Sequence, residues 1–167
     1  MATSIEYLEQ SLANPNVKAV IDTIRHTEGT SAPDGYGYLF GSTPNNTLRF
    51  TDFSTHPNNH QIHNGINSTA AGIGQILYGT YTDLCTKYGF TDFEPHTQEL
   101  MFCALFDQIN VLGALTKGFY LRDDIQSKIG TIWASQPMSK YGQPTHSIAD
   151  VRAFYLSVGG CIGGLTA

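Results

Sequence analysis

Basic residues are scarce in this sequence. Lys and Arg number nine against fourteen Asp and Glu, so the formal net charge over 167 residues is −5. Binding to DNA or RNA is usually dominated by Lys and Arg contacts to phosphate. Nucleic acid is therefore not expected as a partner.

Long apolar runs are also missing, and no stretch is long enough to span a bilayer. The N-terminus, Met1-Ala2-Thr3-Ser4-Ile5-Glu6, lacks the basic and then apolar pattern of a secretion signal. We therefore expect no stable membrane association and a protein that stays in the cytoplasm unless something else releases it.

Cysteine is rare, and the spacing of the cysteines matches no paired motif. Cys85, Cys103 and Cys161 are odd in number and form no Cys-x-x-Cys motif. This favours buried thiols over disulfides or a metal site. The length, with 41% hydrophobic residues, fits a single domain over residues 1–167 that is large enough for a core and a cleft.

The most informative residue that is present is Glu28. A helix is predicted before it, because Asn14 can cap a helix and Pro15 suits its first turn. The 3.6-residue spacing then places one apolar stripe on this helix, formed by Val17, Val20, Ile21 and Ile24. Glu28 continues that stripe, and Gly29 can end the helix. Burial and the helix dipole both disfavour the anion, which suits a general acid. The ordinary alternative is an exposed acid on the last turn.

The composition changes between about residues 31 and 66, where Gly, Pro, Asn, Thr and aromatic residues dominate. Residues 36–40 and 47–53 are typical of short strands, and the stretch between them, residues 42–46, is rich in turn formers. The simplest interpretation is a small hairpin.

Helical patterns return after residue 66. Four helices are predicted: one from a cap at Ser68 or Thr69 to Tyr88, one from Pro95 through Ile109, one from Asp123 or Asp124 to Trp133, and one that Ser147 and Asp150 cap and that ends before Gly159. The fold class is α+β, with an N-terminal helix, a small antiparallel sheet insertion (about 31–66) and a mainly helical lobe (about 67–160).

An acid at the junction of the first helix and the sheet is the layout of lysozyme-like folds, in which the cleft lies between two lobes. The chain also resembles the lambda-phage type of endolysin, a family of lysozyme-like lytic transglycosylases that cut peptidoglycan. The matching runs, in the family's order, are Glu28-Gly29-Thr30, Thr51-Asp52-Phe53-Ser54-Thr55-His56-Pro57, Ser68-Thr69-Ala70-Ala71-Gly72-Ile73-Gly74-Gln75, Gly113-Ala114-Leu115, Trp133-Ala134-Ser135 and Tyr141-Gly142-Gln143.

The resemblance implies roles for individual residues. Glu28 matches the catalytic acid, which protonates the oxygen between N-acetylmuramic acid and N-acetylglucosamine. Substrate contacts are implied for Gln75, which lines the cleft, for Tyr141 on its floor, and for Tyr36, Ser68, Thr69 and Gln143. On physical grounds alone, Gln75 is equally an ordinary polar helix residue, Tyr141 a half-buried loop aromatic, and Ser68 or Thr69 a helix cap.

The chain departs from the family at three places. Gly74 stands where the residue before the glutamine is usually aromatic, and Gly37 follows Tyr36 where relatives commonly carry an acid. The Trp-Ala-Ser run continues as Gln136-Pro137-Met138 instead of an apolar residue, proline and glycine. Substrate placement near Gly74 is therefore open, whereas Glu28 is unaffected.

The mechanism depends on the number of carboxylates. Hydrolysing glycosidases usually need two acids. The candidates besides Glu28 are Asp34, which lies in a predicted turn, and Asp52, which is expected to brace the sheet through Thr51 and Ser54. A transglycosylase works with one acid and forms 1,6-anhydromuramic acid. That chemistry needs no metal or organic cofactor. A hydrolytic muramidase that uses Asp34 or Asp52, and a non-catalytic wall-binding or virion module, are the alternatives.

His56, His60 and His63 raise the possibility of a metal site, because imidazole is a common zinc ligand. Their spacing does not match a zinc signature, and the resemblance supplies only His56, as part of a structural turn. No metal site is expected from them.

The resemblance also implies partners and location. The partner is the glycan strand of peptidoglycan. The protein accumulates as a monomer in the host bacterial cytoplasm, depends on a separate holin for release, and acts on the wall in the periplasm. The acidic balance gives no attraction to an anionic wall, so binding is expected to rest on the cleft.

Overall fold

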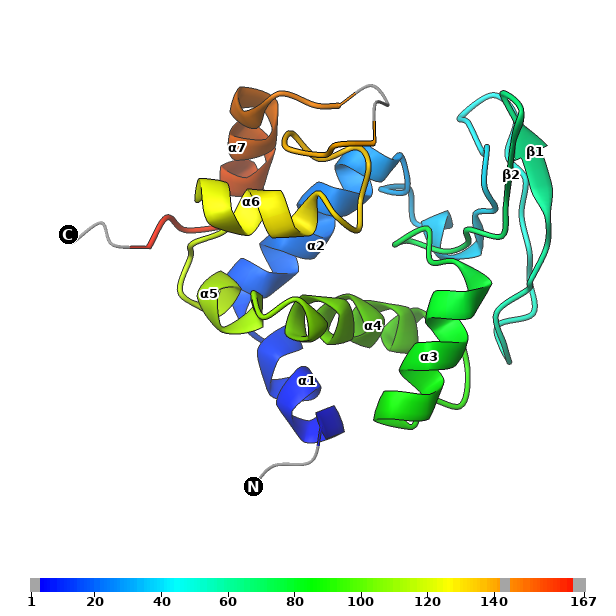
Figure 1. Ribbon diagram of the computed structural model, residues 1–167, viewed down its shortest axis with the longest axis horizontal. Helices are drawn as coiled ribbons and strands as arrows, with labels where there is room; N and C mark the ends of the chain where they lie inside the picture. The colour runs from blue at the N-terminus through cyan, green and yellow to red at the C-terminus, as the bar shows by residue number, and fades with distance from the viewer. Residues whose placement is uncertain (1–3, 142–144, 164–167) are drawn as a thin grey trace. The chain divides into compact units, whose positions relative to one another are not determined.

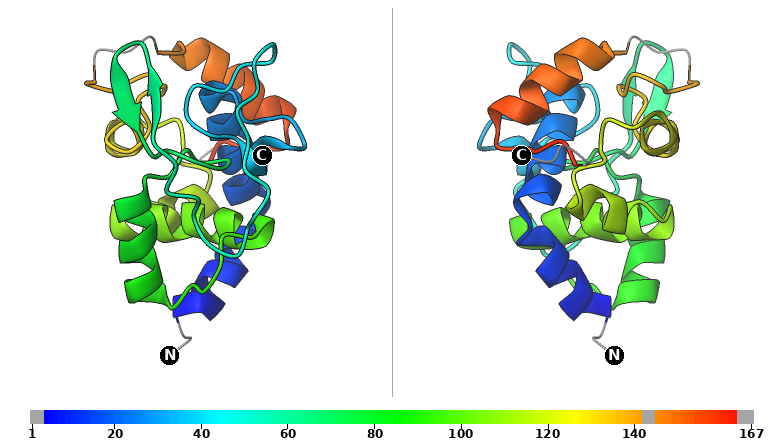
Figure 2. Two further views of the ribbon diagram at one scale, coloured as in Figure 1. Left: turned by 90° about the vertical axis from the view of Figure 1, so that its right-hand side faces the viewer. Right: turned by 90° about the vertical axis from the view of Figure 1, so that its left-hand side faces the viewer.

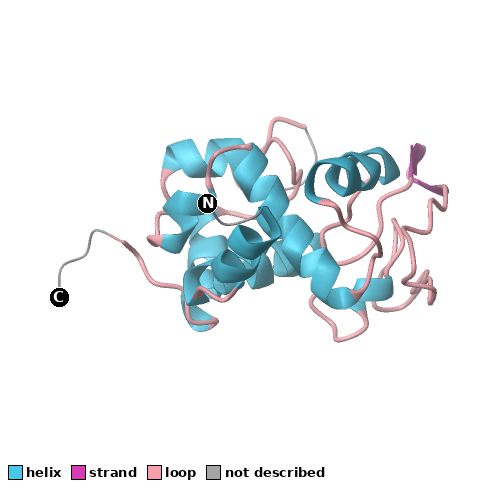
Figure 3. Cartoon of the chain, turned by 90° about the horizontal axis from the view of Figure 1, so that it is seen from below, coloured by secondary structure: helices cyan, strands magenta, loops and turns pink. Residues whose placement is uncertain are grey.

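The computed structural model describes residues 4–141 and 145–163. Helices dominate these residues, and the strands form one small antiparallel pair (Figures 1 and 3). The elements in chain order are α1 (Ser4–Leu12), α2 (Pro15–Glu28), the 3-10 helix η1 (Gly35–Gly37), β1 (Gln61–His63), β2 (Ile66–Ser68), α3 (Tyr78–Tyr88), α4 (Pro95–Gln108), α5 (Leu112–Thr116), α6 (Asp123–Ile129) and α7 (Ile148–Ser157). No helix in the described part of the chain is long and apolar enough to cross a membrane.

The chain divides into two compact units. The first unit contains residues 1–27 and 102–167, and the second contains residues 28–101. The boundaries fall within two helices, since α2 ends at Glu28 and α4 runs through residue 101. The single-domain organisation predicted from the sequence stays a prediction.

The first unit is helical, and its core is aromatic. Phe102 and Phe106 of α4 pack against Trp133, with ring centroids 5.2 and 5.6 Å from the indole. Tyr120 and Tyr155 are also buried, and their ring centroids lie 5.1 Å apart. Within this unit, α7 lies alongside the second half of α2 (Figure 2), where the rings of Phe154 and His26 stack.

The prediction for α2 is confirmed. Pro15 is its first residue, and the Asn14 side chain accepts a hydrogen bond of 2.9 Å from the backbone N–H of Asn16. The predicted apolar stripe is completely buried, at Val17, Val20, Ile21 and Ile24. Gly29 follows the helix with a φ of +77°, which glycine adopts without strain.

The second unit contains the sheet, but not as predicted. Residues 36–53 do approach each other as a hairpin, with Leu39 N–H donating to the Leu48 carbonyl (2.9 Å) and Phe50 N–H to that of Gly37 (2.9 Å). They form isolated bridges and a 3-10 turn, so the prediction of two regular strands there is wrong. The regular strands are β1 and β2, which Asn64 and Gly65 join, both with positive φ.

The helix predicted from Ser68 or Thr69 to Tyr88 ends correctly but starts too early. The structure begins α3 at Tyr78. Before it, Gly72 and Gln75 both have positive φ (77° and 47°), and Ala71 pairs with Ile76 as an antiparallel bridge. This backbone forms a tight turn, which a helix cannot contain.

The remaining helices agree with the predictions in part. Pro95 begins α4, although Ile109 lies just beyond its end, and α6 stops at Ile129 instead of reaching Trp133. The predicted cap of α7 is confirmed, since the Ser147 hydroxyl accepts from Asp150 N–H. Helices α1 and α5 were not predicted.

The three cysteines are free thiols, as expected, but they differ in burial. Cys103 is buried in α4 and Cys85 is partly buried in α3. Cys161 is exposed, so the expectation of a buried thiol is wrong there. Its backbone N–H is held by the Asn16 side chain at 2.9 Å, which explains how a residue after the last helix is fixed while its thiol faces solvent.

Candidate active site

Glu28 is the last residue of α2 and is half-buried. The chain that leaves it is anchored at once, because the buried Thr30 hydroxyl donates a hydrogen bond of 2.7 Å to the Ile73 carbonyl. On the other side, the hydroxyl of buried Thr27 accepts hydrogen bonds from Ser135 (3.0 Å) and from the Gln136 side chain (2.7 Å). Glu28 is therefore flanked in sequence by two anchored threonines.

Asp34 and Asp52 are both held by local partners. Asp34 forms an ion pair with Arg49. One Asp52 carboxylate oxygen accepts from the Ser54 hydroxyl (2.6 Å) and from the Ser54 backbone N–H (2.9 Å), as the sequence predicts. These hydrogen bonds, that of the hydroxyl first, lower the pKa of Asp52. Asp52 therefore favours the anion in an exposed turn.

Tyr36 and Gln75 are two predicted substrate contacts in the second unit. The Tyr36 hydroxyl donates a hydrogen bond of 2.7 Å to Glu99 of α4. The Gln75 side-chain NH2 donates to the carbonyl of Gly72 at 2.9 Å and that of Tyr38 at 3.4 Å. Gln75 is not a helix residue, which corrects one of the two interpretations of it. Both side chains are positioned by bonds to their own unit.

Ser68 and Thr69 serve the backbone in this structure. The Ser68 hydroxyl accepts from Ala70 N–H (3.1 Å), and the Thr69 hydroxyl accepts from Tyr78 N–H (3.0 Å) at the first turn of α3. The Thr69 hydroxyl therefore accepts from the first backbone N–H of α3, but the N-cap residue is Leu77, eight residues after the position that the capping interpretation gives. A role for either hydroxyl toward sugar stays a prediction.

Tyr141 is 59% exposed and borders a cavity of about 460 Å³ in the first unit. Its hydroxyl donates a hydrogen bond of 2.6 Å to the Thr131 carbonyl, which fixes the ring at the surface. Met138 and two cations, Lys128 and Lys140, also line the cavity. An exposed aromatic face beside two ammonium groups can receive a sugar that carries carboxylates. Gln143, the remaining predicted contact, lies outside the described residues.

One departure from the family has a structural reason. A Cβ at Gly37 would lie 2.7 Å from the Phe50 carbonyl oxygen, so a side chain would push the two halves of the hairpin apart. The acid that the resemblance implies after Tyr36 cannot be accommodated with this backbone. Gly74 is buried.

His56 is structural, as expected. It is buried, and its Nε2 lies 2.7 Å from the Ile76 carbonyl while its Nδ1 accepts from Asn58 N–H at 3.0 Å. Burial lowers the pKa of this imidazole. His60 and His63 are exposed. The described residues do contain one group of three side chains suited to a metal, but it is formed by His26, His146 and Asp150.

The sequence reasoning missed this group. His146 and Asp150 are four residues apart across the N-terminus of α7, a spacing that brings two side chains close when the chain is helical, and this signal was available. His26 was visible only as a neighbour of Glu28. His26 and His146 are 120 positions apart in sequence. Their approach depends on how α7 packs on α2, which the sequence pattern does not indicate.

The fold and the site define the class of protein: a mixed α+β, lysozyme-like chain with a carboxylate at the end of its second helix. Comparison with known proteins agrees. The solved structure of bacteriophage lambda lysozyme complexed with a chitohexasaccharide matches with a TM-score of 0.79 and 26% identity, over 89% of this chain and 97% of that one. A second structure of bacteriophage lambda lysozyme gives a TM-score of 0.76.

The particular family follows from the sequence comparisons. The family profile described as Endolysin matches residues 18–162. The endolysin of Escherichia phage lambda is 31% identical over 159 residues, which covers 89% of this chain and 94% of that protein. The endolysin of Escherichia phage P2 is 29% identical over 156 residues, covering 87% and 93%. The chain belongs to the endolysin family and is a peptidoglycan-cleaving enzyme with a lysozyme-like fold.

Proposed function

We propose that this endolysin is a lytic transglycosylase. It cleaves the β-1,4 bond between N-acetylmuramic acid and N-acetylglucosamine, forms 1,6-anhydromuramic acid, and thereby lyses the host cell. The substrate class is supported by family membership and by the likeness to a lysozyme whose structure holds a chitohexasaccharide. The choice of reaction rests on the carboxylates of this chain.

The observation that carries the proposal is that the two other candidate acids are occupied. Asp34 forms an ion pair with Arg49, and Asp52 accepts two hydrogen bonds from Ser54. In a hydrolase one of them would have to turn from its partner toward the sugar to act as a nucleophile or to activate water. Glu28, half-buried at the end of α2, is then the single acid for the reaction.

One carboxyl group suffices if it works twice. Protonated Glu28 first gives its proton to the glycosidic oxygen, and the bond from that oxygen to C1 of the muramic acid breaks. The resulting carboxylate takes the proton of the C6 hydroxyl of the same sugar. The C6 oxygen attacks C1 and closes the 1,6-anhydro ring, so Glu28 ends protonated and no water is consumed.

The proposed substrate contacts are Gln75, Tyr36, Ser68, Thr69 and Tyr141. In Gln75 the NH2 group is directed at two carbonyls, which leaves the amide oxygen as the atom to accept from a sugar hydroxyl. Tyr141 offers the face of its ring, because its hydroxyl is directed at Thr131. The lysines beside it, Lys128 and Lys140, suit the carboxylates of the peptide stems.

The test is mass spectrometry of the ends released from purified peptidoglycan. Wild type, Glu28→Gln, Asp34→Asn and Asp52→Asn are compared, with Glu94→Gln as a control that makes the same chemical change at an exposed site. Anhydro ends, one water lighter than reducing ends, are expected from every protein except Glu28→Gln.

Two results would contradict the proposal. Reducing ends that disappear in Asp34→Asn or Asp52→Asn would identify a hydrolytic muramidase. Absence of cleavage by the wild type, together with co-sedimentation with peptidoglycan, would identify a wall-binding module. Circular dichroism of each variant separates loss of chemistry from loss of folding.

The family likeness further supports accumulation as a monomer in the host cytoplasm and release through a separate holin. Expression inside bacteria tests this. Cell density is expected to hold until chloroform or a co-expressed holin opens the membrane, and then to fall. Lysis that begins without either treatment would contradict the dependence on a holin.

A further inference from the structure

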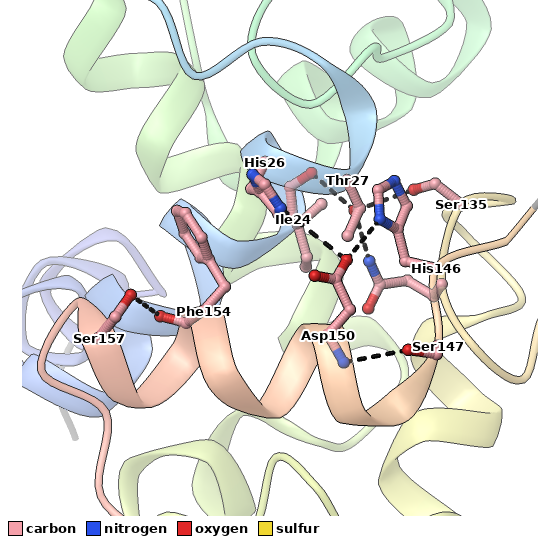
Figure 4. Close-up of polar contacts among 10 residues, drawn as sticks. Ile24, His26, Thr27, Ser135, His146, Ser147, Asp150, Phe154 and Ser157 are labelled. Atoms are coloured by element: carbon pink, nitrogen blue, oxygen red, sulfur yellow. Dashed lines mark hydrogen bonds and ion pairs between the residues drawn. The ribbon is translucent and has the colours of Figure 1, made fainter.

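Three side chains of the first unit converge on one point. His26 lies on the last turn of α2, His146 directly before the N-cap residue of α7, and Asp150 on the first turn of α7 (Figure 4). The Asp150 Oδ2 atom is 2.8 Å from His146 Nδ1 and 4.0 Å from His26 Nε2. One ligand atom from each residue can be chosen so that all three lie within 4.8 Å of one another.

His26 is held in place by an aromatic ring. The imidazole stacks on Phe154, with centroids 4.1 Å apart and planes inclined by only 7°. Phe154 follows Asp150 by four residues on α7, so both face α2 from the same side of that helix (Figure 4). The stacking fixes the plane of the His26 ring while its edge, with Nε2, is directed at Asp150.

His146 and Asp150 are fixed through the backbone. His146 N–H donates to the Ser135 carbonyl at 3.1 Å, and the Ser135 hydroxyl in turn donates to Thr27, the neighbour of His26, at 3.0 Å (Figure 4). Asp150 N–H donates to the Ser147 hydroxyl that caps α7. The ring plane of His26 and the backbones of His146 and Asp150 are therefore each held by a contact outside the group.

We propose that His26 Nε2, His146 Nδ1 and Asp150 Oδ2 form a binding site for a divalent transition-metal ion of the zinc class. Two imidazoles and one carboxylate are a common ligand set for such ions. Metal–ligand bonds of about 2.1 Å at tetrahedral angles place ligand atoms roughly 3.4 Å apart. The distances of 2.8 and 4.0 Å lie on either side of that value, so small side-chain rotations reach it.

The site is open to solvent. The side chains of His26, His146 and Asp150 are 35%, 36% and 49% exposed, so an ion can enter without unfolding. Three protein ligands leave the fourth tetrahedral position for an external ligand. A bound ion would join the C-terminal turn of α2 to the N-terminus of α7. This inference does not depend on the proposed glycan chemistry, in which no metal takes part.

Isothermal titration of Zn²⁺ into the full-length, metal-free protein tests the site. One equivalent is expected to bind to the wild type, and affinity is expected to fall at least about tenfold in His26→Gln, His146→Gln and Asp150→Asn. His60→Gln and His96→Gln remove exposed imidazoles elsewhere, and Cys161→Ser removes the exposed thiol, so these three variants should bind as the wild type does.

Two further readouts make the result decisive. Co²⁺ should give the intense visible bands of a tetrahedral site without thiolate charge transfer, and Zn²⁺ should raise the melting temperature of the wild type but not of Asp150→Asn. The proposal is overturned if the wild type binds no Zn²⁺, if Asp150→Asn and His26→Gln bind it unchanged, or if Cys161→Ser abolishes binding.

Discussion

The side-chain oxygen of Gln98 accepts a hydrogen bond of 3.0 Å from the backbone N–H of Ile73. The same amide donates through its NH2 group to the carbonyls of Tyr36 (3.0 Å) and Phe93 (2.9 Å). Gln98 is 1% exposed. One residue of α4 therefore satisfies three backbone groups on three segments and fixes the turn that carries Gln75.

Replacing Gln98 by Leu should destabilise the protein strongly. The change keeps the size and apolar fit but leaves one N–H and two carbonyls without their partner, at about 1–3 kcal/mol for each buried unsatisfied group. We expect the free energy of unfolding to fall by about 3 kcal/mol, measured by urea denaturation. Gln108→Leu, at the exposed end of the same helix, should change it by less than about 0.5 kcal/mol. Equal effects would show that the buried amide has no special role.

His56 should make stability depend on pH. Burial lowers its pKa in the folded state below the ordinary value of 6.5, so the unfolded chain binds the extra proton more readily. The contribution is complete above about pH 6.5 and is lost as the pH falls through the lower, folded pKa. Nuclear magnetic resonance titration should show a depressed His56 pKa. In urea unfolding, the free energy of unfolding of the wild type should rise between pH 5 and 7. This rise should be smaller in His56→Gln and unchanged in His60→Gln.

The sequence predicts those elements whose signals are local. The ends of α2 follow from Asn14, Pro15 and Gly29, and its buried face from apolar spacing, all within one segment. The start of α3 was wrong because the turn at Gly72 and Gln75 is set by Gln98, which is distant in sequence. The strands β1 and β2 were missed because their side chains are mostly exposed and show no apolar alternation.

The site was predictable to a similar degree. The position of Glu28 follows from the helix that carries it, and the contact of Asp52 with Ser54 from their closeness in sequence. The ion pair of Asp34 with Arg49 was not predictable, because it depends on how the hairpin folds. The same holds for the approach of His26 to His146 and Asp150, which only the packing of two helices produces.

Replacing Thr27 by Val tests whether the hydrogen bonds of Thr27 are needed to hold the neighbouring Glu28 in place. Its hydroxyl donates to the Ile24 carbonyl at 3.0 Å and accepts from Ser135 and Gln136, and Gln136 in turn accepts from Tyr120 at 2.9 Å. Thr27→Val keeps the shape but leaves the buried Gln136 NH2 unpaired, so we expect a loss of about 2 kcal/mol in unfolding free energy. Thr86→Val is the control, because Thr86 makes a similar bond within α3 at an exposed position.

Activity provides the second measurement on Thr27→Val. If the network positions the carboxylate, peptidoglycan turnover well below the melting temperature should fall about tenfold, while the fraction of anhydro ends stays unchanged. Thr86→Val should retain the wild-type rate. A destabilised Thr27→Val protein with full activity would show that this network supports folding alone.

Two variants of Tyr141 distinguish ring stacking from hydrogen bonding at the proposed substrate surface. The side chain is 59% exposed, so its replacement should leave the unfolding free energy within about 0.5 kcal/mol of the wild type. Tyr141→Phe keeps the ring face and loses only the bond to Thr131. Tyr141→Ala loses the face, and on soluble glycan fragments we expect kcat/KM to fall about tenfold, equivalent to about 1.4 kcal/mol, chiefly through KM. A wild-type kcat/KM in Tyr141→Ala would place the substrate elsewhere, whereas a loss in Tyr141→Phe equal to that in Tyr141→Ala would assign the role to the hydroxyl and its hold on Thr131.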